Sequence, residues 1–221
     1  MEAMVRGSLP EIIRNDHSLY EGDLKWYFLN VFYNAQNLWH PYHNFRHMTH
    51  VLWLCYQACS YYKEMLSPSQ MRMLLIAAMF HDFDHSGLSG NDDLNIERAV
   101  RGFSKYIAPE DKSLEENISL LIRTTEFPHK GDSVSMTLLA KILRDADMCQ
   151  VLNPVWIQQV AFGLAAEWGK TPVEILNAQE AFLTNLKFNT EWAKEMFPQE
   201  VIEAKIEEVA GLLEILNPEN R

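Results

Sequence analysis

The chain has few cysteines and no long apolar run, and each shortage excludes a class of protein. Its three cysteines, Cys55, Cys59 and Cys149, include no CxxC pair, which argues against a disulfide framework and favours a reducing compartment. The longest uninterrupted apolar run is the eight residues 73–80, whereas a membrane span needs about 18. No secretory signal is visible near the N-terminus. We therefore expect a cytoplasmic protein with no membrane span.

Positive charge is also scarce. Nineteen lysines and arginines stand against thirty aspartates and glutamates, a net charge of -11. This excess repels nucleic acids and anionic membranes, and the sequence shows no basic patch, so we expect neither as a partner. If the substrate carries a phosphate, the positive charge that it needs must come from bound metal.

Glycine and proline together number only 18, and the apolar residues recur three and four apart nearly everywhere. This period is helical, and no sustained alternation of period two occurs, so we predict an all-α fold with a single domain over residues 1–221. The predicted helices span 19–36, 45–65, 68–80, 91–106, 113–125, 134–149, 154–168, 172–196 and 198–216.

Five of the eight histidines fall in two short blocks. The first is YHNFRHMTH at residues 42–50, and the second is HDFDHSG at residues 81–87, directly after the apolar run. A buried helix that ends in His-Asp places an imidazole and a carboxylate at the rim of the core, where metal or strong hydrogen bonds must offset their desolvation. A third element, RDADM at residues 144–148, adds carboxylates. Such ligands suit Zn, Mn, Fe or Mg, and a carboxylate with two oxygens can bridge a second ion.

The order of these residues resembles a known signature. His47, then His81-Asp82, then Asp147 resembles the H…HD…D pattern of the HD-domain superfamily of metal-dependent phosphohydrolases, which is all-α. Within it, the two blocks are most similar to the YHNxxHAxDV and HDxDHxG motifs of class I cyclic-nucleotide phosphodiesterases. The similarity continues weakly through Thr125 and reaches residues 178–182, AQEAF, which resemble the SQxxF segment of that family.

The resemblance implies roles for individual residues. The ligands of the metal are expected to be His47, His81, Asp82 and Asp147, with Asp82 reaching a second divalent ion, so that two ions (Zn, Mg or Mn, with Fe possible) serve as cofactors. Such a pair of ions would activate water and clamp phosphoryl oxygens. The remaining expected site residues are His43 as the general acid, His85, Thr125 and Glu97 as hydrogen-bonding support around the metals, and Gln179, Phe182 and Tyr42 against a small nucleotide substrate.

The implied activity is hydrolysis of a 3′,5′-cyclic nucleotide to a nucleoside 5′-monophosphate. Three alternatives stay open: an HD-type nucleotidase or other phosphomonoesterase, a diiron oxygenase, and a non-catalytic nucleotide-binding domain. The sequence departs from the phosphodiesterase pattern at His50 and Ser86, and it is shorter than that catalytic domain, with little chain between Asp147 and Gln179. His50 is predicted to face either solvent or a substrate phosphate, and the oligomeric state is not specified.

Overall fold

The computed structural model describes residues 7–90, 92–129 and 135–216, and within these ranges every regular element is helical, which confirms the all-α prediction. The predicted helix starts at Asn91 and Val134 lie outside the described residues. The α-helices are α1 (Leu9–Arg14), α2 (Lys25–Asn34), α3 (Phe45–Tyr61), α4 (Pro68–Phe80), α5 (Asp92–Tyr106), α6 (Glu115–Arg123), α7 (Leu138–Met148), α8 (Gly163–Trp168), α9 (Pro172–Asn185), α10 (Glu191–Met196) and α11 (Gln199–Leu216). Short 3₁₀ turns cover Pro109–Leu114 and Cys149–Leu152, and a π-helix covers Ile157–Phe162.

Helix α4 is the central element, and its bounds are those that the sequence predicts. Ser67 caps its N-terminus: the Ser67 hydroxyl accepts a hydrogen bond from the backbone N–H of Gln70, and the Gln70 side-chain oxygen accepts one from the backbone N–H of Ser67. Pro68 is the first helical residue, a position where a missing N–H costs nothing. Its residues 74–80 are all buried, and it packs against α2, α3, α5, α6 and α7. A helix that is apolar on all sides belongs in a core, and its C-terminal end therefore delivers whatever follows it to the interior.

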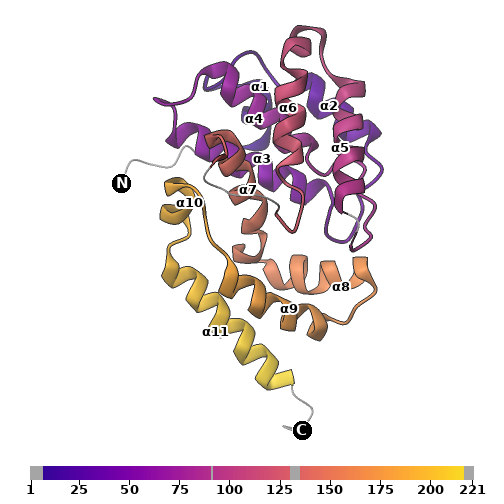
Figure 1. Cartoon of the computed structure of the whole chain (residues 1–221), viewed down its shortest axis with the longest axis vertical. Helices are drawn as coiled ribbons and strands as arrows, with labels where there is room; N and C mark the ends of the chain where they lie inside the picture. The colour runs from indigo at the N-terminus through magenta and orange to yellow at the C-terminus, as the bar shows by residue number, and fades with distance from the viewer. Residues whose placement is uncertain (1–6, 91, 130–134, 217–221) are drawn as a thin grey trace.

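The buried apolar residues form two clusters. The first contains residues of all helices from α1 through α7, among them the aromatic side chains Tyr27, Phe80 and Phe103. The second joins the π-helix, α8, α9 and α11 around Trp156. In Figure 1 the elements of the second cluster form the orange and yellow layer below the first, with α11 along its edge. Phe188 and Phe197 pack against both clusters.

The structure corrects two predicted helices. The segment predicted as a helix over 19–36 becomes helical only at Lys25, because Asn15 binds the backbone of Leu19, Tyr20 and Gly22 and holds these residues in a loop. The predicted helix over 172–196 is divided into α9 and α10. At the break, the buried carboxylate of Asp145 accepts from the backbone N–H groups of Asn189 and Thr190, which a continuous helix would use internally. In addition, α1 was not predicted, although Ser8 and Glu11 form a capping box.

None of the helices in the described ranges combines the length and the apolar character that a bilayer-crossing segment requires. The assignment of residues 1–221 to a single domain stays a prediction.

Packing at Gly102 gives a stability prediction. A Cβ at this position of α5 would lie against the ring of Phe83 more closely than a real Cβ approaches any atom, and Phe83 is itself held between Phe80 and Tyr106. We expect Gly102→Ala to lower the free energy of unfolding by about 1–3 kcal/mol, because the added methyl group forces the ring out of its packing between Phe80 and Tyr106. Thermal and urea denaturation measure the effect.

The matched control is Gly211→Ala in α11, where the added Cβ meets nothing within 4 Å. There the substitution is expected to stabilise the protein by about 0.5–1 kcal/mol, because alanine favours the helix. Equal effects at Gly102 and Gly211 would contradict this account of the packing.

Candidate metal centre and active site

Four predicted ligands, supplied by α3, the end of α4 and the end of α7, converge at one point. Nε2 of His47 lies 3.0 Å from Oδ1 of Asp147 and 3.2 Å from Oδ2 of Asp82. Nε2 of His81 lies 3.2 Å from that of His47, 3.3 Å from the same Asp82 oxygen and 3.5 Å from the Asp147 oxygen. The donor atoms of residues that are up to 100 positions apart in the chain therefore face one another.

Local structure explains this convergence. Asn44 caps α3 by accepting from the backbone N–H groups of Arg46 and His47, which places His47 in the first helical turn. His81 and Asp82 follow the last residue of the buried α4, and Asp147 lies in the last turn of α7. Because α3, α4 and α7 pack against one another, these helix ends meet.

The donor set fits a divalent ion. Ligand atoms about 2.0–2.1 Å from Zn or Mg lie roughly 3.0–3.4 Å from one another in tetrahedral or octahedral coordination, and the group formed by His47, His81 and Asp147 is close to this spacing, at 3.0 to 3.5 Å. His81 Nδ1 donates to the carbonyl of Ala78 at 2.8 Å, so the Nε2 lone pair of the neutral ring is directed to the centre. Oδ2 of Asp82 is buried and accepts no hydrogen bond from the described residues. A buried carboxylate oxygen between two imidazoles requires a positive partner.

Without an ion, protons supply that positive charge. Burial favours the neutral ring of His47, but its close contacts with the carboxylates of Asp147 and Asp82 outweigh it and raise the pKa of His47 to about 9. Burial likewise opposes ionisation of Asp82, yet the adjacent imidazoles, His81 first, hold the pKa of that carboxyl well below its usual range. The metal-free centre at neutral pH is therefore a cluster of imidazolium and carboxylate groups.

Metal binding is consequently expected to release protons at pH 7, because the ion takes the lone pair that the proton holds on His47. The affinity for Zn²⁺ or Mn²⁺ is expected to rise with pH from neutrality towards about 9, the pKa of His47, and to level off above it. Conversely, the stability that charged His47 gives the metal-free fold is complete below about pH 6.5 and is lost as the pH rises through about 9.

Calorimetric titration in buffers of different ionisation enthalpy measures the released protons. Substitution of the exposed His17 by alanine should leave the release unchanged. An affinity that is independent of pH between 6.5 and 9 would contradict this prediction.

A buried asparagine joins the two histidine blocks. Asn37 is fully buried, and its Nδ2 donates to the carbonyl oxygens of both His43 and Asp82 at 2.8 Å. Its Oδ1 accepts from the backbone N–H of Asp84, a residue with φ of 60°. The single side chain of Asn37 thus fixes the first block against the second.

The predicted general acid has a carboxylate partner that the sequence analysis did not identify. Nδ1 of His43 lies 2.5 Å from Oε1 of Glu167, near the end of α8. The other oxygen of Glu167 accepts from the backbone N–H groups of Tyr42 and His43 at 2.7 and 3.0 Å. Burial opposes ionisation of Glu167, but these bonds, that with His43 first, lower its pKa. An ionised Glu167 fixes Nδ1 of His43 as a donor and leaves Nε2 for proton exchange with a ligand.

The approach of α8 depends on a small residue at its start. A Cβ on Gly163 would come within 2.9 Å of the backbone oxygen of Pro41. Glycine therefore allows α8 to lie against the loop that carries His43.

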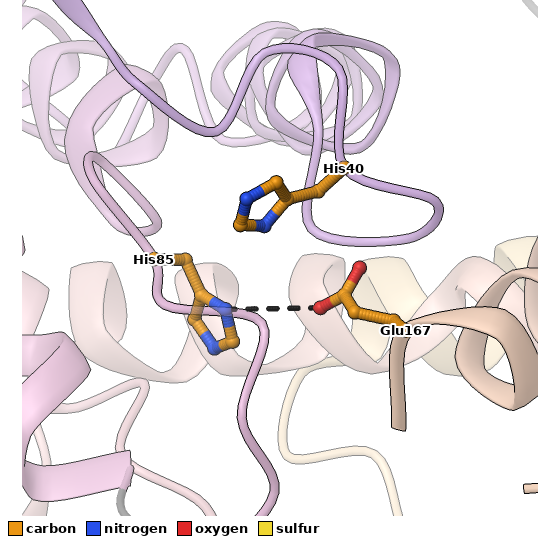
Figure 2. A group of neighbouring side chains, drawn as sticks. All are labelled: His40, His85 and Glu167. Carbon is orange, nitrogen blue, oxygen red and sulfur yellow. Dashed lines mark ion pairs between the residues drawn. The ribbon is translucent and has the colours of Figure 1, made fainter. Parts of the chain in front are cut away.

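His40, His85 and Glu167 form a second group with atoms suited to metal binding, and Figure 2 shows them gathered, with a 3.9 Å contact between His85 and Glu167. Two of the three have a donor atom engaged, whereas Nδ1 of His40 is buried and has no hydrogen-bond partner among the described residues. Nδ1 of His85 accepts from the backbone N–H of Gly87 at 3.0 Å, and Oε1 of Glu167 holds His43. This group therefore supports His43 rather than providing a second ion site.

His85 lies directly against His43, the predicted general acid. Its ring stacks on that of His43 with centroids 3.6 Å apart, and its Nε2 meets Nδ2 of Asn95 at 2.9 Å. Burial, and then the charge of His43, lower the pKa of His85 to about 4, so the ring is neutral at pH 7. His85 is therefore a neutral ring in direct contact with His43.

The metal centre lies in the wall of a cavity of about 760 Å³ between the two apolar clusters. Its lining includes the expected substrate residues Gln179, Phe182 and Tyr42, together with Thr125. The Tyr42 ring stacks on that of His47 with centroids 5.2 Å apart, and the Phe182 ring lies 6.4 Å from that of Phe127. The hydroxyl of Thr125 donates to the carbonyl of Ile122 at 2.8 Å.

Two residues of interest are not brought to the centre. Glu97 is exposed and forms an ion pair with Arg123. It does not line the cavity described above. His50 is partly exposed and does not line that cavity: its Nδ1 lies 2.9 Å from Oε1 of Gln150, and its ring is stacked parallel to Trp53.

The residues that sequence reasoning missed are Glu167, Asn37 and Asn95. Glu167 had one usable signal: it is the lone charged residue in the otherwise apolar stretch 160–168. The two asparagines had none, because each is single and acts through contacts that depend on the tertiary structure.

Part of the chain matches a known protein family. Residues 42–101 match the family model described as 3′5′-cyclic nucleotide phosphodiesterase. This segment contains both histidine blocks but not Asp147, Glu167 or Gln179, so it covers a minority of the chain. No curated protein matches the chain.

Proposed function

We propose that this protein is a metal-dependent phosphodiesterase that opens 3′,5′-cyclic nucleotides to nucleoside 5′-monophosphates. The observation that carries the proposal is the placement of His43, held by Glu167, in the same cavity wall as three of the four expected metal ligands. The match of residues 42–101 to the phosphodiesterase family supports this choice of substrate.

The ligand side chains would hold divalent ions that neutralise phosphoryl charge and activate water, as in other two-metal hydrolytic sites. The residues that would hold them are His47, His81, Asp82 and Asp147. Because the chain has a net charge of -11, the ions would also provide the positive field that attracts the anionic substrate.

The chain's own side chains account for the departure of the sugar oxygen. As water adds to phosphorus and the bond from phosphorus to O3′ breaks, Nε2 of His43 donates a proton to O3′. Ionised Glu167 stabilises the protonated ring beforehand through Nδ1. His85 is neutral and adds no second charge to the pair of stacked rings. Gln179 would contact the base edge and Phe182 its face, because both line the cavity.

Incubation of the metal-loaded protein with cyclic AMP, cyclic GMP and a panel of nucleoside monophosphates tests the proposal. Chromatography and ³¹P NMR are expected to show ring opening to a 5′-monophosphate without release of inorganic phosphate. Release of phosphate from monophosphates, with cyclic nucleotides left intact, would instead identify a nucleotidase and refute the phosphodiesterase assignment.

A further inference from the structure

A second cavity, of about 420 Å³, shares no lining residue with the first. It lies between the end of α2 and the outer face of α5, and Phe83 and Asp84 complete its wall. These two residues belong to the loop that carries the metal ligands His81 and Asp82. The two cavities therefore flank one loop.

The second cavity is basic in an acidic protein. Arg98, Arg101 and Lys105 line it from positions three and four apart on α5, a spacing that puts them on one helix face. None of the three forms an ion pair within the part of the chain that the structure describes. The nearby carboxylate of Glu97 is already paired with Arg123. Like charges on one helix face repel one another unless an anion lies between them.

The one carboxylate in the wall, that of Asp84, offsets only part of this charge. Oδ1 of Asp84 accepts from the backbone N–H of Gln36 at 2.8 Å, and Arg98 reaches the Asp84 carbonyl, not its carboxylate. Three cations thus face a single, engaged carboxylate. The expectation that the chain has no basic patch is therefore wrong: residues 98–105 contain all three cations and no acidic residue, and the helix places them on one face.

Aromatic side chains complete the site. Tyr33 lines the cavity with 76% of its surface exposed, and Tyr106 lines it with the ammonium of Lys105 placed 4.8 Å from the ring centroid. Exposed tyrosine rings beside cations are suited to a ligand that has a flat ring as well as negative charge.

We propose that this cavity binds a phosphate monoester that carries a flat ring, of the class of a nucleoside monophosphate. The phosphate contacts Arg98, Arg101 and Lys105, and the ring lies against Tyr33. A concave volume of about 420 Å³ matches a small molecule, whereas a macromolecular polyanion requires a broader basic surface. The inference is independent of the proposed function, since it uses none of the metal-centre residues.

Binding at this site is linked to the metal centre through a short path of hydrogen bonds. Arg98 donates to the carbonyl of Asp84, whose N–H donates to Asn37, and Asn37 in turn donates to the carbonyl of Asp82. The ligand therefore contacts the same loop that holds the metal ligands.

NMR titration of the full-length, metal-loaded protein with AMP tests the proposal. We expect saturable shifts of the Nε–H signals of Arg98 and Arg101 and of the backbone amides of Gln36 and Gly102. In the double variant Arg101→Gln, Lys105→Gln, affinity at this site is expected to fall at least about tenfold, because two charged contacts are lost. The matched control Arg14→Gln removes an exposed arginine that pairs with Asp16 elsewhere and should leave binding unchanged.

Two further ligands define the chemistry. Adenosine is expected to shift these signals only weakly because it lacks the phosphate, and inorganic phosphate should bind at least about tenfold more weakly than AMP because it lacks the ring. Shifts confined to the metal-centre cavity, or equal binding of AMP and adenosine, would overturn the proposal. Equal affinity for AMP and inorganic phosphate would overturn the assignment of the ring contact. Shifts at the metal-centre cavity arise from a separate set of residues and report on the proposed function alone.

Discussion

Asp82→Asn is expected to abolish both metal retention and hydrolysis of cyclic nucleotides. The substitution keeps the shape of the side chain but removes the charge of the one oxygen that lies 3.2 and 3.3 Å from the two imidazole nitrogens. Loss of a residue that merely supports a ligand weakens metal binding by about 10- to 100-fold, so removal of the ligand Asp82 itself should weaken metal binding by more than about 100-fold. Metal content after dialysis and the turnover of cyclic AMP measure the two effects.

The control for this variant is Asp93→Asn, which changes an exposed aspartate in the first turn of α5. It should retain its metal and its turnover, and circular dichroism should show that both variants are folded. Full metal content in Asp82→Asn would disprove the ligand assignment.

His43→Gln is expected to retain the metals and to lose about 10²- to 10⁴-fold in turnover, the range typical of a general acid. The reason is that His43 lies beside the centre but is not among the side chains whose donor atoms converge there. Glu167→Gln should keep His43 in place while removing the negative charge that stabilises its protonated ring, and a smaller loss of turnover follows. Steady-state rates and metal content distinguish the two roles.

Glu180→Gln is the matched control, because Glu180 is an exposed residue of α9. A substrate whose leaving group is already a stable anion provides a further check, because that group needs no proton. A nucleotide phosphodiester with nitrophenolate as its leaving group should largely restore the rate of His43→Gln. If both the natural and the activated substrates lost the same factor, His43 would be assigned to binding and not to proton transfer.

Local chemistry made much of the fold predictable. The capping residue Ser67, the proline after it and the apolar run to Phe80 are sufficient to define α4, and the His-Asp pair after it could be expected at the edge of the core. The break between α9 and α10 was not predictable, because the carboxylate of Asp145 that holds it is 44 positions away.

The candidate site likewise contains residues that the sequence predicts and residues that only the tertiary structure brings into it. His43, His47, His81 and Asp82 lie in dense blocks, where their residue types and spacing are visible in the sequence. Glu167 is separated from His43 by 124 positions, and only the packing of α8 against the His43 loop brings them together. The basic face of α5 was visible in the sequence, since its three cations recur three and four apart within a predicted helix.

The two apolar clusters have a consequence for the order in which the protein becomes competent. The expected ion ligands end at Asp147, whereas the partner of the proton donor, Glu167, and the expected base contact, Gln179, occur later in the chain and belong to α8 and α9. Chains are synthesised from the N-terminus. On the ribosome, all the expected metal ligands are therefore synthesised before Glu167, the partner of the proton donor. Metal binding can thus precede catalytic competence during biosynthesis.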